Sequence, residues 1–348
     1  MMKSRKGLLV GAALAVGVLA PGTASAQGEP EIEELALGFG VDVAFAPHVV
    51  AIEKGWFEDA GFAGVSTRTF TAGALAGEAL VAGEIHLWTP GNLPPISMVH
   101  NAIPVVVIGN NAIANGLEKL VVRSDAGVEA PEDLCNIKVG LLQGSTSSAF
   151  LGALAAHYGL DPACLQVVNL PPPEQLASLV SGDTQALLSW EPWPYRALEG
   201  TDAEIVHTGL VSHFPQNEGE EVKVSHNRSL YVVSQEFARD HPNAVQALVD
   251  VLTRAQKYVA DPANREEVVK LFSEFQNQDP EVNAELWDNF VFDPTIDEAY
   301  VADMAATADF LEQSGRISDR MDVLDYTYTA PLQAADPSLV EVEGQWQP

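Results

Sequence analysis

The sequence predicts an α/β protein with two lobes, each built from strands that alternate with helices. Three observations lead to this prediction. Short apolar runs alternate with helical stretches through the first two thirds of the chain, and the last third is mostly helical. Two β-α blocks, one in the first third and one in the middle, have a similar layout. The chain has 348 residues, which is enough for two domains with cores of their own.

The first block contains four expected strands, which apolar runs mark at residues 34–39, 65–70, 85–88 and 103–108. The last run is continuously apolar, as buried parallel strands are. Three helices alternate with these strands. One opens at Pro47 with Val49, Ile52 and Trp56 on one face, another covers residues 75–81 before Gly83, and the third starts at Pro94 and Pro95.

The middle block repeats this pattern, with strands expected at residues 138–142, 165–169 and 186–190. Two helices separate them, one after Gly144-Ser145-Thr146 and one led by three prolines at residues 171–173. The side chains expected to be buried on these helices are Phe150, Leu151, Leu154 and Tyr158 on the first, and Leu176, Leu179 and Val180 on the second. The alternation of strands and helices predicts a parallel sheet with right-handed crossovers.

Two amphipathic helices are expected in the last third. The first begins at Pro242, and its apolar stripe contains Val245, Leu248, Val249, Leu252 and Val259. The second is expected to follow a capping box at Thr295-Ile296-Asp297-Glu298. Its buried face is expected to contain Tyr300, Met304 and Leu311.

The first 26 residues are expected to be an export signal. Lys3, Arg5 and Lys6 make a basic start, the apolar run at residues 8–20 is too short to span a bilayer, and Ala24-Ser25-Ala26 is a small-x-small cleavage site. Cleavage after Ala26 would make Gln27 the first residue of the mature chain. An uncleaved membrane anchor is the alternative interpretation.

The chain is strongly acidic, with 48 acidic and 18 basic residues. Removal of the signal takes away three basic residues and no acidic ones, which leaves a mature charge of about −33. This charge excludes a nucleic-acid-binding protein and argues against docking on anionic lipid. A solvated acidic surface suited to salty water is favoured over a surface that steers cations.

The two cysteines, Cys135 and Cys164, each precede an apolar run. If these runs are neighbouring parallel strands, the cysteines lie side by side at the amino ends of the strands, and a disulfide is expected in an exported protein. It would close a loop of about 30 residues. The sequence has no CxxC motif and no His/Cys spacing typical of a metal site, so neither a metal nor another cofactor is expected.

The candidate ligand-binding residues lie mostly just after predicted strands, because ligands in open α/β sheets bind beyond the carboxyl ends of the strands. These strand ends are rich in Gly, Asn, Ser, Thr and Trp, and they carry no Lys or Arg. The candidates are Gly40, Phe45, Trp88, Thr89, Asn92, Asn110, Gln143, Ser145, Thr146, Trp190 and Glu191.

Two of these places have a specific interpretation. Ser145 and Thr146 stand at a helix start, where free N–H groups and the helix dipole suit an anion, although the alternative is an ordinary N-cap that serves its own helix. Glu191 and Trp190 stand on a corner held by Pro192 and Pro194. They are expected at the edge of a ligand cleft, and the alternative is a solvated Glu191 beside core tryptophans.

Six pieces of the chain carry a family resemblance, and they occur in family order over nearly the whole mature chain: "APHVVAIEKGWFEDAGF" (46–62), "ALAGEALVAGEIHL" (74–87), "IPVVVIG" (103–109), "CNIKVGLLQGSTSSAF" (135–150), "VVNLPPPEQLASLVSGDTQALLSWEPW" (167–193) and "ADFLEQSGRI" (308–317). With these pieces the chain resembles the periplasmic solute-binding proteins of ABC importers for nitrate, sulfonates, taurine and thiamine-pyrimidine precursors.

The resemblance implies the type II periplasmic binding protein fold, in which two hinge crossings join two α/β lobes around a ligand cleft. The expected division is a signal peptide at 1–26, lobe 1 at 27–118, lobe 2 at 119–222, and a return to lobe 1 with C-terminal helices at 223–348. The resemblance also places Ser145, Thr146, Trp88-Thr89 and the Trp190-Glu191 corner in the cleft. The implied partners are a small-molecule solute and the membrane permease of an ABC transporter, and the protein is expected to be a periplasmic monomer.

A binding protein without chemistry of its own is therefore expected. "GFGVDVA" (38–44) begins like a dinucleotide loop, but Val43 stands where the third glycine should be. There is no HExxH, GxSxG or P-loop motif, and the cysteine-rich motif of the resembling thiamine-pyrimidine enzyme is absent. An exported enzyme on the same fold and a sensor ectodomain are the alternatives from other classes.

The expected solute follows from the candidate residues. Hydroxyl and N–H donors at one end, with Glu191 and tryptophan faces at the other, suit a zwitterion that carries a sulfonate and an amine. Taurine-like or other small sulfonates are therefore expected first. Pyrimidine-like thiamine precursors come second, and bicarbonate or nitrate third.

Overall fold

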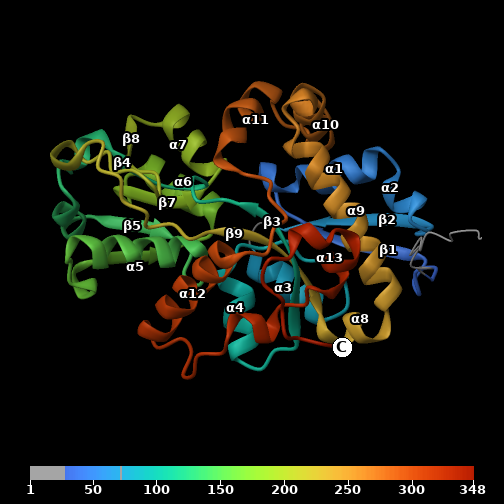
Figure 1. Ribbon diagram of the computed structural model, residues 1–348. Coiled ribbons are helices and arrows are strands. Elements are labelled where there is room, and N and C mark those ends of the chain that lie inside the picture. The colour runs from blue at the N-terminus through green and yellow to red at the C-terminus, as the bar shows by residue number, and fades with distance from the viewer. Residues whose placement is uncertain (1–27, 71–72) are drawn as a thin grey trace, which may run out of the picture.

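The computed structural model describes residues 28–70 and 73–348, and it has two α/β lobes that lie side by side (Figure 1). The expected signal peptide lies outside the described residues. Within the described part of the chain, no helix is both long and apolar enough to cross a bilayer.

One lobe contains a five-stranded sheet with the strand order β6-β5-β7-β4-β8. Its strands are β4 (Glu118–Arg123), β5 (Lys138–Leu141), β6 (Gln166–Asn169), β7 (Ala186–Trp190) and β8 (Ala203–His207). The strand β5 pairs in parallel with both β6 and β7, which confirms the parallel sheet predicted for the middle block. The strands β4 and β8 were not predicted, and β4 pairs antiparallel with β7 and with β8.

Three helices accompany this sheet: α5 (Thr146–Tyr158), α6 (Pro172–Ser181) and α7 (Trp193–Gly200). Phe150, Leu151 and Leu154 are buried on α5, as predicted. On α6 the prediction is right for Leu179, which is buried, and wrong for Val180, which is 54% exposed. The reason is that successive residues of a helix point about 100° apart, so Val180 faces solvent beside a buried neighbour.

The other lobe contains two strand pairs. The strands β1 (Glu34–Phe39) and β2 (Gly64–Thr69) pair in parallel, and β3 (Val105–Ile113) pairs antiparallel with β9 (Arg228–Ser234). The segment predicted as a strand at 85–88 is linked to both pairs by single bridges, Leu37 to Leu87 and Trp88 to Val232. The parallel pairing suggested for residues 103–108 is wrong, because a continuous apolar run reports burial on both faces and not the direction of the partner strand.

Ten helices are described in this lobe: α1 (Ala46–Glu53), α2 (Trp56–Asp59), α3 (Gly73–Val81), α4 (Leu93–His100), α8 (Gln235–Asp240), α9 (Pro242–Ala260), α10 (Arg265–Gln276), α11 (Pro280–Leu286), α12 (Glu298–Gln313) and α13 (Ala330–Ala335). Trp56 belongs to α2 and not to the helix opened by Pro47, because Gly55 takes a φ of +67° and ends α1. The N-cap of α12 is Asp297, whose carboxylate accepts a hydrogen bond from the Tyr300 N–H, so the capping box predicted to start at Thr295 is wrong.

Each lobe has its own hydrophobic core. The larger core draws on residues between 35 and 117 and between 230 and 346, and the core of the five-stranded lobe draws on residues between 120 and 224. The chain therefore crosses between the lobes twice, once before β4 and once between β8 and β9. The lobe boundaries at 118/119 and 222/223 stay predictions.

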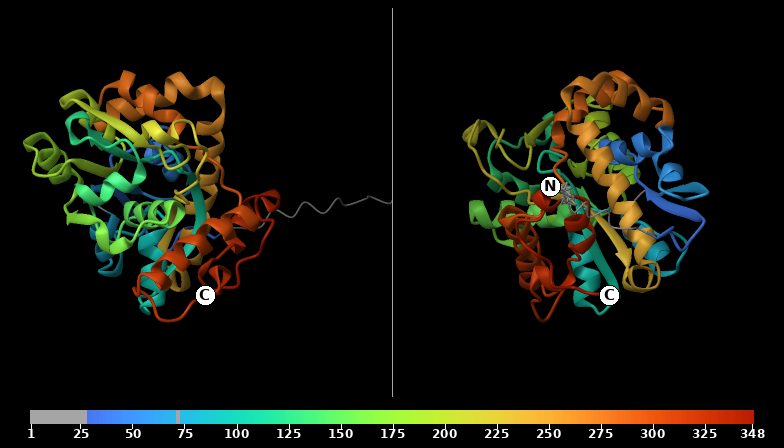
Figure 2. Two further views of the ribbon diagram at one scale, coloured as in Figure 1. Left: turned by 90° about the vertical axis from the view of Figure 1, so that its left-hand side faces the viewer. Right: turned by 45° about the vertical axis from the view of Figure 1, so that its right-hand side comes forward.

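The last long helix, α12, contacts both lobes (Figure 2). It packs against α4 of its own lobe and against α5 of the other. Asp303 on α12 also forms ion pairs with Lys223 of the second crossing and with Arg228 at the start of β9, at 2.7 and 2.9 Å. This helix thus fixes the second crossing to the larger lobe.

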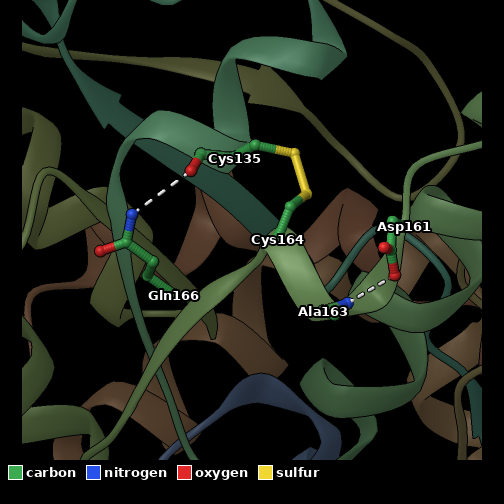
Figure 3. The surroundings of a disulfide bond; sticks show 5 residues. All are labelled: Cys135, Asp161, Ala163, Cys164 and Gln166. Carbon is green, nitrogen blue, oxygen red and sulfur yellow. Dashed lines mark hydrogen bonds between the residues drawn. A yellow bond between two sulfur atoms is a disulfide. The ribbon is translucent and has the colours of Figure 1, made fainter.

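The predicted disulfide is present. Cys135 and Cys164 are bonded, with Cα atoms 4.9 Å apart (Figure 3). They lie just ahead of β5 and β6, whose register pairs Lys138 with Gln166. The cysteines are therefore neighbours because the two strands are parallel and adjacent, which confirms the reason for which the bond was predicted.

Candidate functional site

A cavity lies where residues of the two lobes meet. It holds about 840 Å³ of space not filled by protein atoms, including open solvent at its mouth. Seven of the predicted ligand-binding residues line it: Gly40, Phe45, Trp88, Thr89, Ser145, Thr146 and Trp190. The first four come from the larger lobe and the last three from the five-stranded lobe, so the cavity has walls from both.

Three other predicted residues do not line this cavity. Asn92 donates to the backbone oxygen of His226 and to the Thr307 hydroxyl, both at 2.9 Å, and it lines a smaller second cavity. Asn110 donates to the backbone oxygen of Asp293. The side chain of Gln143 is exposed to solvent.

Glu191 is also absent from the cavity lining. Its carboxylate is ion-paired with Lys119, and it accepts a hydrogen bond from the Tyr195 N–H in the first turn of α7. Glu191 follows β7, which ends at Trp190, and its buried carboxylate is engaged by Lys119 and by the start of α7 instead of the cavity. The predicted role of Glu191 at the cleft is therefore corrected: its charge is used within the five-stranded lobe.

A different glutamate, Glu118, lines the cavity and was not predicted. Its buried carboxylate accepts hydrogen bonds from the hydroxyls of Thr146 and Ser225 and from the side-chain amide of Asn227. Burial raises the pKa of Glu118 to about 7, against the lowering effect of these hydrogen bonds. Thr146 belongs to α5, whereas Ser225 and Asn227 belong to the second crossing, so this one carboxylate connects α5 to the crossing.

A second carboxylate, Asp42, also lines the cavity. It caps the short 3-10 helix Val43–Phe45 by accepting a hydrogen bond from the Ala44 N–H. Burial raises the pKa of Asp42 to about 6. Among the described residues that line the cavity, none is Lys, Arg or His.

Aromatic rings supply much of the remaining wall. They belong to Phe39, Phe45, Phe70, Trp88 and Trp190. Carboxylates together with aromatic faces suit a positively charged or N–H-donating group of a ligand. The cavity is thus built to accept such a group without a protein cation beside it.

The start of α5 lies at the same cavity. Ser145 is the N-cap residue, but its hydroxyl donates to the backbone oxygen of Leu142 at 2.7 Å, and the hydroxyl of Thr146 donates to Glu118. Neither hydroxyl caps the helix, so the alternative in which these residues only serve their own helix is not the arrangement in the structure.

The chain is similar in sequence to known proteins. A family model described as the NMT1-like family matches residues 28–273. The taurine-binding periplasmic protein of Escherichia coli (strain K12) is 27% identical over 217 residues, which cover 62% of this chain and 64% of that protein. A putative aliphatic sulfonates-binding protein of Bacillus subtilis (strain 168) is 24% identical over 326 residues, which cover 92% of this chain and 94% of that protein.

Solved structures share the fold. The alkanesulfonate-binding protein SsuA from Xanthomonas axonopodis pv. citri, bound to MOPS, superposes with a TM-score of 0.72 at 21% identity, and the match covers 87% of this chain and 100% of that one. The desulfurization enzyme DSZB superposes with a TM-score of 0.64 at 17% identity, over 88% and 99% of the two chains. The same fold is thus used by a binding protein and by an enzyme.

Proposed function

We propose that this chain, which belongs to the NMT1-like family, is the periplasmic solute-binding component of an ABC importer. The observation that carries the proposal is the cavity whose walls come from both lobes. A solute held there contacts both lobes at once, so its binding favours the closed arrangement over the open one. A membrane permease could then recognise the closed protein.

The proposed solute is a taurine-like or other small sulfonate with an amine. Glu118, Asp42 and the aromatic rings suit the amine, and the hydroxyl groups of the cavity suit the sulfonate. The assignment of the amine end to Glu191 is replaced by Glu118, which is the carboxylate at the cavity.

The alternative solutes are less well supported by the lining. A bare anion such as nitrate or bicarbonate would be placed beside two carboxylates, with no cation among the described lining residues to balance it. A pyrimidine-like thiamine precursor could stack on Trp88 or Trp190, and it remains the second candidate.

An enzymatic role is kept as the candidate from another class, because an enzyme shares the fold. In the part of the chain that the structure describes, both cysteines are in the disulfide, so neither offers a thiol nucleophile. The Nε2 of His48 lies 2.9 Å from the hydroxyl of Thr89 in the lining, but burial lowers the pKa of His48 to about 3, so the ring is a weak base for activating that hydroxyl. We therefore propose binding without turnover.

The test is mass spectrometry of the small molecule released when the protein, purified from its native compartment, is denatured. One equivalent of an amino-sulfonate, followed by calorimetric binding of the same compound without turnover, is the expected result. A released compound that is chemically changed on incubation with the protein would favour the enzyme.

A further inference from the structure

Two hydroxyl groups of the larger lobe line the cavity with buried, uncharged partners behind them. They belong to Thr89 and Ser229. Isolated bridges pair Trp88 with Val232 and Gly91 with Ser229, so the segment 88–91 runs antiparallel to β9. Thr89 and Ser229 are therefore diagonal neighbours, and residues in this relation lie about 7–8 Å apart on one face of a sheet.

The partner of Thr89 is His48, whose ring is fully buried among Phe39, Phe45 and Tyr231. Burial lowers the pKa of His48 to about 3, so the ring is neutral at physiological pH. Its Nε2 lies 2.9 Å from the Thr89 hydroxyl oxygen.

The surroundings of the His48 ring indicate which of its two nitrogens carries the proton. Nδ1 is buried and has no hydrogen-bond partner among the described residues. A buried N–H without a partner is rarer and more costly than an unused acceptor, so the proton belongs on Nε2. His48 therefore donates a hydrogen bond to the Thr89 hydroxyl oxygen, and the hydroxyl proton of Thr89 stays available for donation to a solute.

The partner of Ser229 is Asn111, and here the backbone fixes the direction. The Asn111 amide nitrogen donates to the carbonyl oxygen of Ala44 at 2.9 Å and to the Ser229 hydroxyl at 3.0 Å. A carbonyl oxygen only accepts, so the amide cannot be flipped. Its oxygen instead accepts from the Tyr231 hydroxyl at 2.7 Å, and burial keeps that phenol protonated by raising its pKa well above 10. The Ser229 hydroxyl thus accepts a hydrogen bond from Asn111, and its own proton stays available for donation to a solute.

We infer that Thr89 and Ser229 are specificity-determining residues that donate hydrogen bonds to the acid oxygens of the solute, with His48 and Asn111 as positioning residues that set this direction. Neither hydroxyl is hydrogen-bonded to an acceptor among the described residues. This inference rests on the proposed function, and it names the group that the larger lobe recognises: a sulfonate or a carboxylate.

Uncharged hydrogen-bond donors suit an acid group in this cavity better than a Lys or Arg would. A Lys or Arg at the same place would pair with Glu118 or Asp42 across the cavity and compete with the amine of the solute. Two hydroxyls, each fixed from behind, stabilise an acid group without adding a positive charge. The solute is then held with its acid oxygens toward Thr89 and Ser229, and its amine toward the carboxylates.

The experiment measures calorimetric affinities for three probes: taurine, its carboxylate counterpart β-alanine, and ethylammonium, which lacks acid oxygens. Thr89→Val and Ser229→Ala should each weaken binding of the better of the two acid probes by about 10- to 150-fold, the effect of losing a hydrogen bond to a charged group. Binding of ethylammonium should be unchanged. The wild-type preference between taurine and β-alanine distinguishes a sulfonate from a carboxylate.

His48→Phe tests the positioning role, because it keeps an aromatic ring and removes the donor to Thr89. The substitution should weaken binding of the acid probe and leave binding of ethylammonium unchanged. A merely structural role of His48 would instead weaken binding of all three probes. Thr89→Ser keeps the hydroxyl and should retain binding. Thr184→Val, which removes a buried hydroxyl away from the cavity, is the matched control.

Equal losses for the acid probe and ethylammonium, or wild-type affinity in Thr89→Val and Ser229→Ala, would overturn the inference and leave the proposed function intact. If the wild-type protein binds none of the three probes and releases no small molecule on denaturation, the proposed function itself is wrong, and the inference with it.

Discussion

Glu118 begins β4 and Glu191 directly follows the neighbouring strand β7, but their carboxylates serve different purposes. The register pairs Glu118 with Trp190, the residue before Glu191. Glu118 lines the cavity and accepts hydrogen bonds from neutral groups only, whereas Glu191 is neutralised by Lys119. Of these two glutamates, Glu118 is the one whose charge is available to a solute.

The first prediction compares these two carboxylates. Glu118→Gln should weaken the binding of taurine about 10- to 150-fold, because a charge-assisted contact is typically worth about 1.5–3 kcal/mol. Glu191→Gln is the matched control, and its effect should appear in thermal stability rather than in affinity, because it leaves Lys119 without its partner. Isothermal titration calorimetry measures the affinities. Wild-type affinity in Glu118→Gln, or a larger loss in Glu191→Gln, would contradict the assignment.

The second prediction concerns pH. The pKa of Glu118 is raised from 4.5 to about 7 by burial, so the empty folded protein holds this proton up to neutral pH. The stabilising contribution of the proton is complete below pH 4.5 and is lost as the pH rises through about 7. The proton also competes with the ammonium group of a solute. Affinity for taurine should therefore rise by up to about tenfold per pH unit towards pH 7 and level off above it.

Calorimetry at several pH values between 5 and 8 checks this prediction. Asp42, whose pKa is raised to about 6 by burial, titrates in the same window. The Glu118→Gln variant should therefore lose the rise in affinity between pH 6 and 7 and keep only the rise below about pH 6 that Asp42 causes. A wild-type profile that is flat, or that falls towards neutral pH, would show that Glu118 does not face the amine.

Whether a cavity residue was predicted from the sequence depended on where the strands end and on the direction in which they run. Ligand contacts were expected at the carboxyl ends of strands, and Trp190 lies there at the end of β7. Glu118 was missed because β4 runs antiparallel to β7, which brings the amino end of β4 to the same edge of the sheet. Asn110 was included for the opposite reason: β3 continues to Ile113, so Asn110 lies inside the strand and not after it.

At the scale of elements, strand order was predictable where the chain itself enforces it. A strand–helix–strand–helix–strand segment closes into parallel neighbours, and β5, β6 and β7 do so. The strands β4, β8 and β9 pair antiparallel with partners far apart in the sequence. No local pattern identifies such partners, because alternation and burial leave the direction of pairing open.

The third prediction concerns the disulfide, which ties the segments that enter β5 and β6. The two cysteines are 29 residues apart, and closing a loop of this length stabilises the fold by about 3–4 kcal/mol in the chain-entropy model. Reduction should lower the free energy of unfolding by this amount. Chemical denaturation with and without reductant measures it, and the Cys135→Ser/Cys164→Ser variant is the control that should not respond to reductant. Equal stability of the oxidised and reduced protein would contradict this role.

At the scale of the whole molecule, charge is the dominant feature. The chain has 48 acidic and 18 basic residues, a formal net charge of −30. Like charges on one surface repel each other and destabilise the folded state, and salt screens this repulsion over about 8–10 Å at physiological ionic strength. The destabilising effect of the acidic surface should therefore depend on the ionic strength of the medium.

The fourth prediction follows from this repulsion. The melting temperature should rise markedly between dilute buffer and molar NaCl, because screening removes a cost that only the folded state carries in full. Differential scanning calorimetry at several NaCl concentrations measures the rise. A melting temperature that stays constant would show that the acidic surface is not an adaptation to high salt.

The central claim is that a small solute binds between the two lobes and draws them together. Small-angle X-ray scattering with and without the co-purified solute tests this claim most directly, because closure of a hinged pair of lobes reduces the radius of gyration. The account predicts a smaller radius at saturating solute, with no change when the solute is added to a Glu118→Gln, Thr89→Val double variant at the same concentration. A wild-type radius that is unchanged at saturating solute would contradict it.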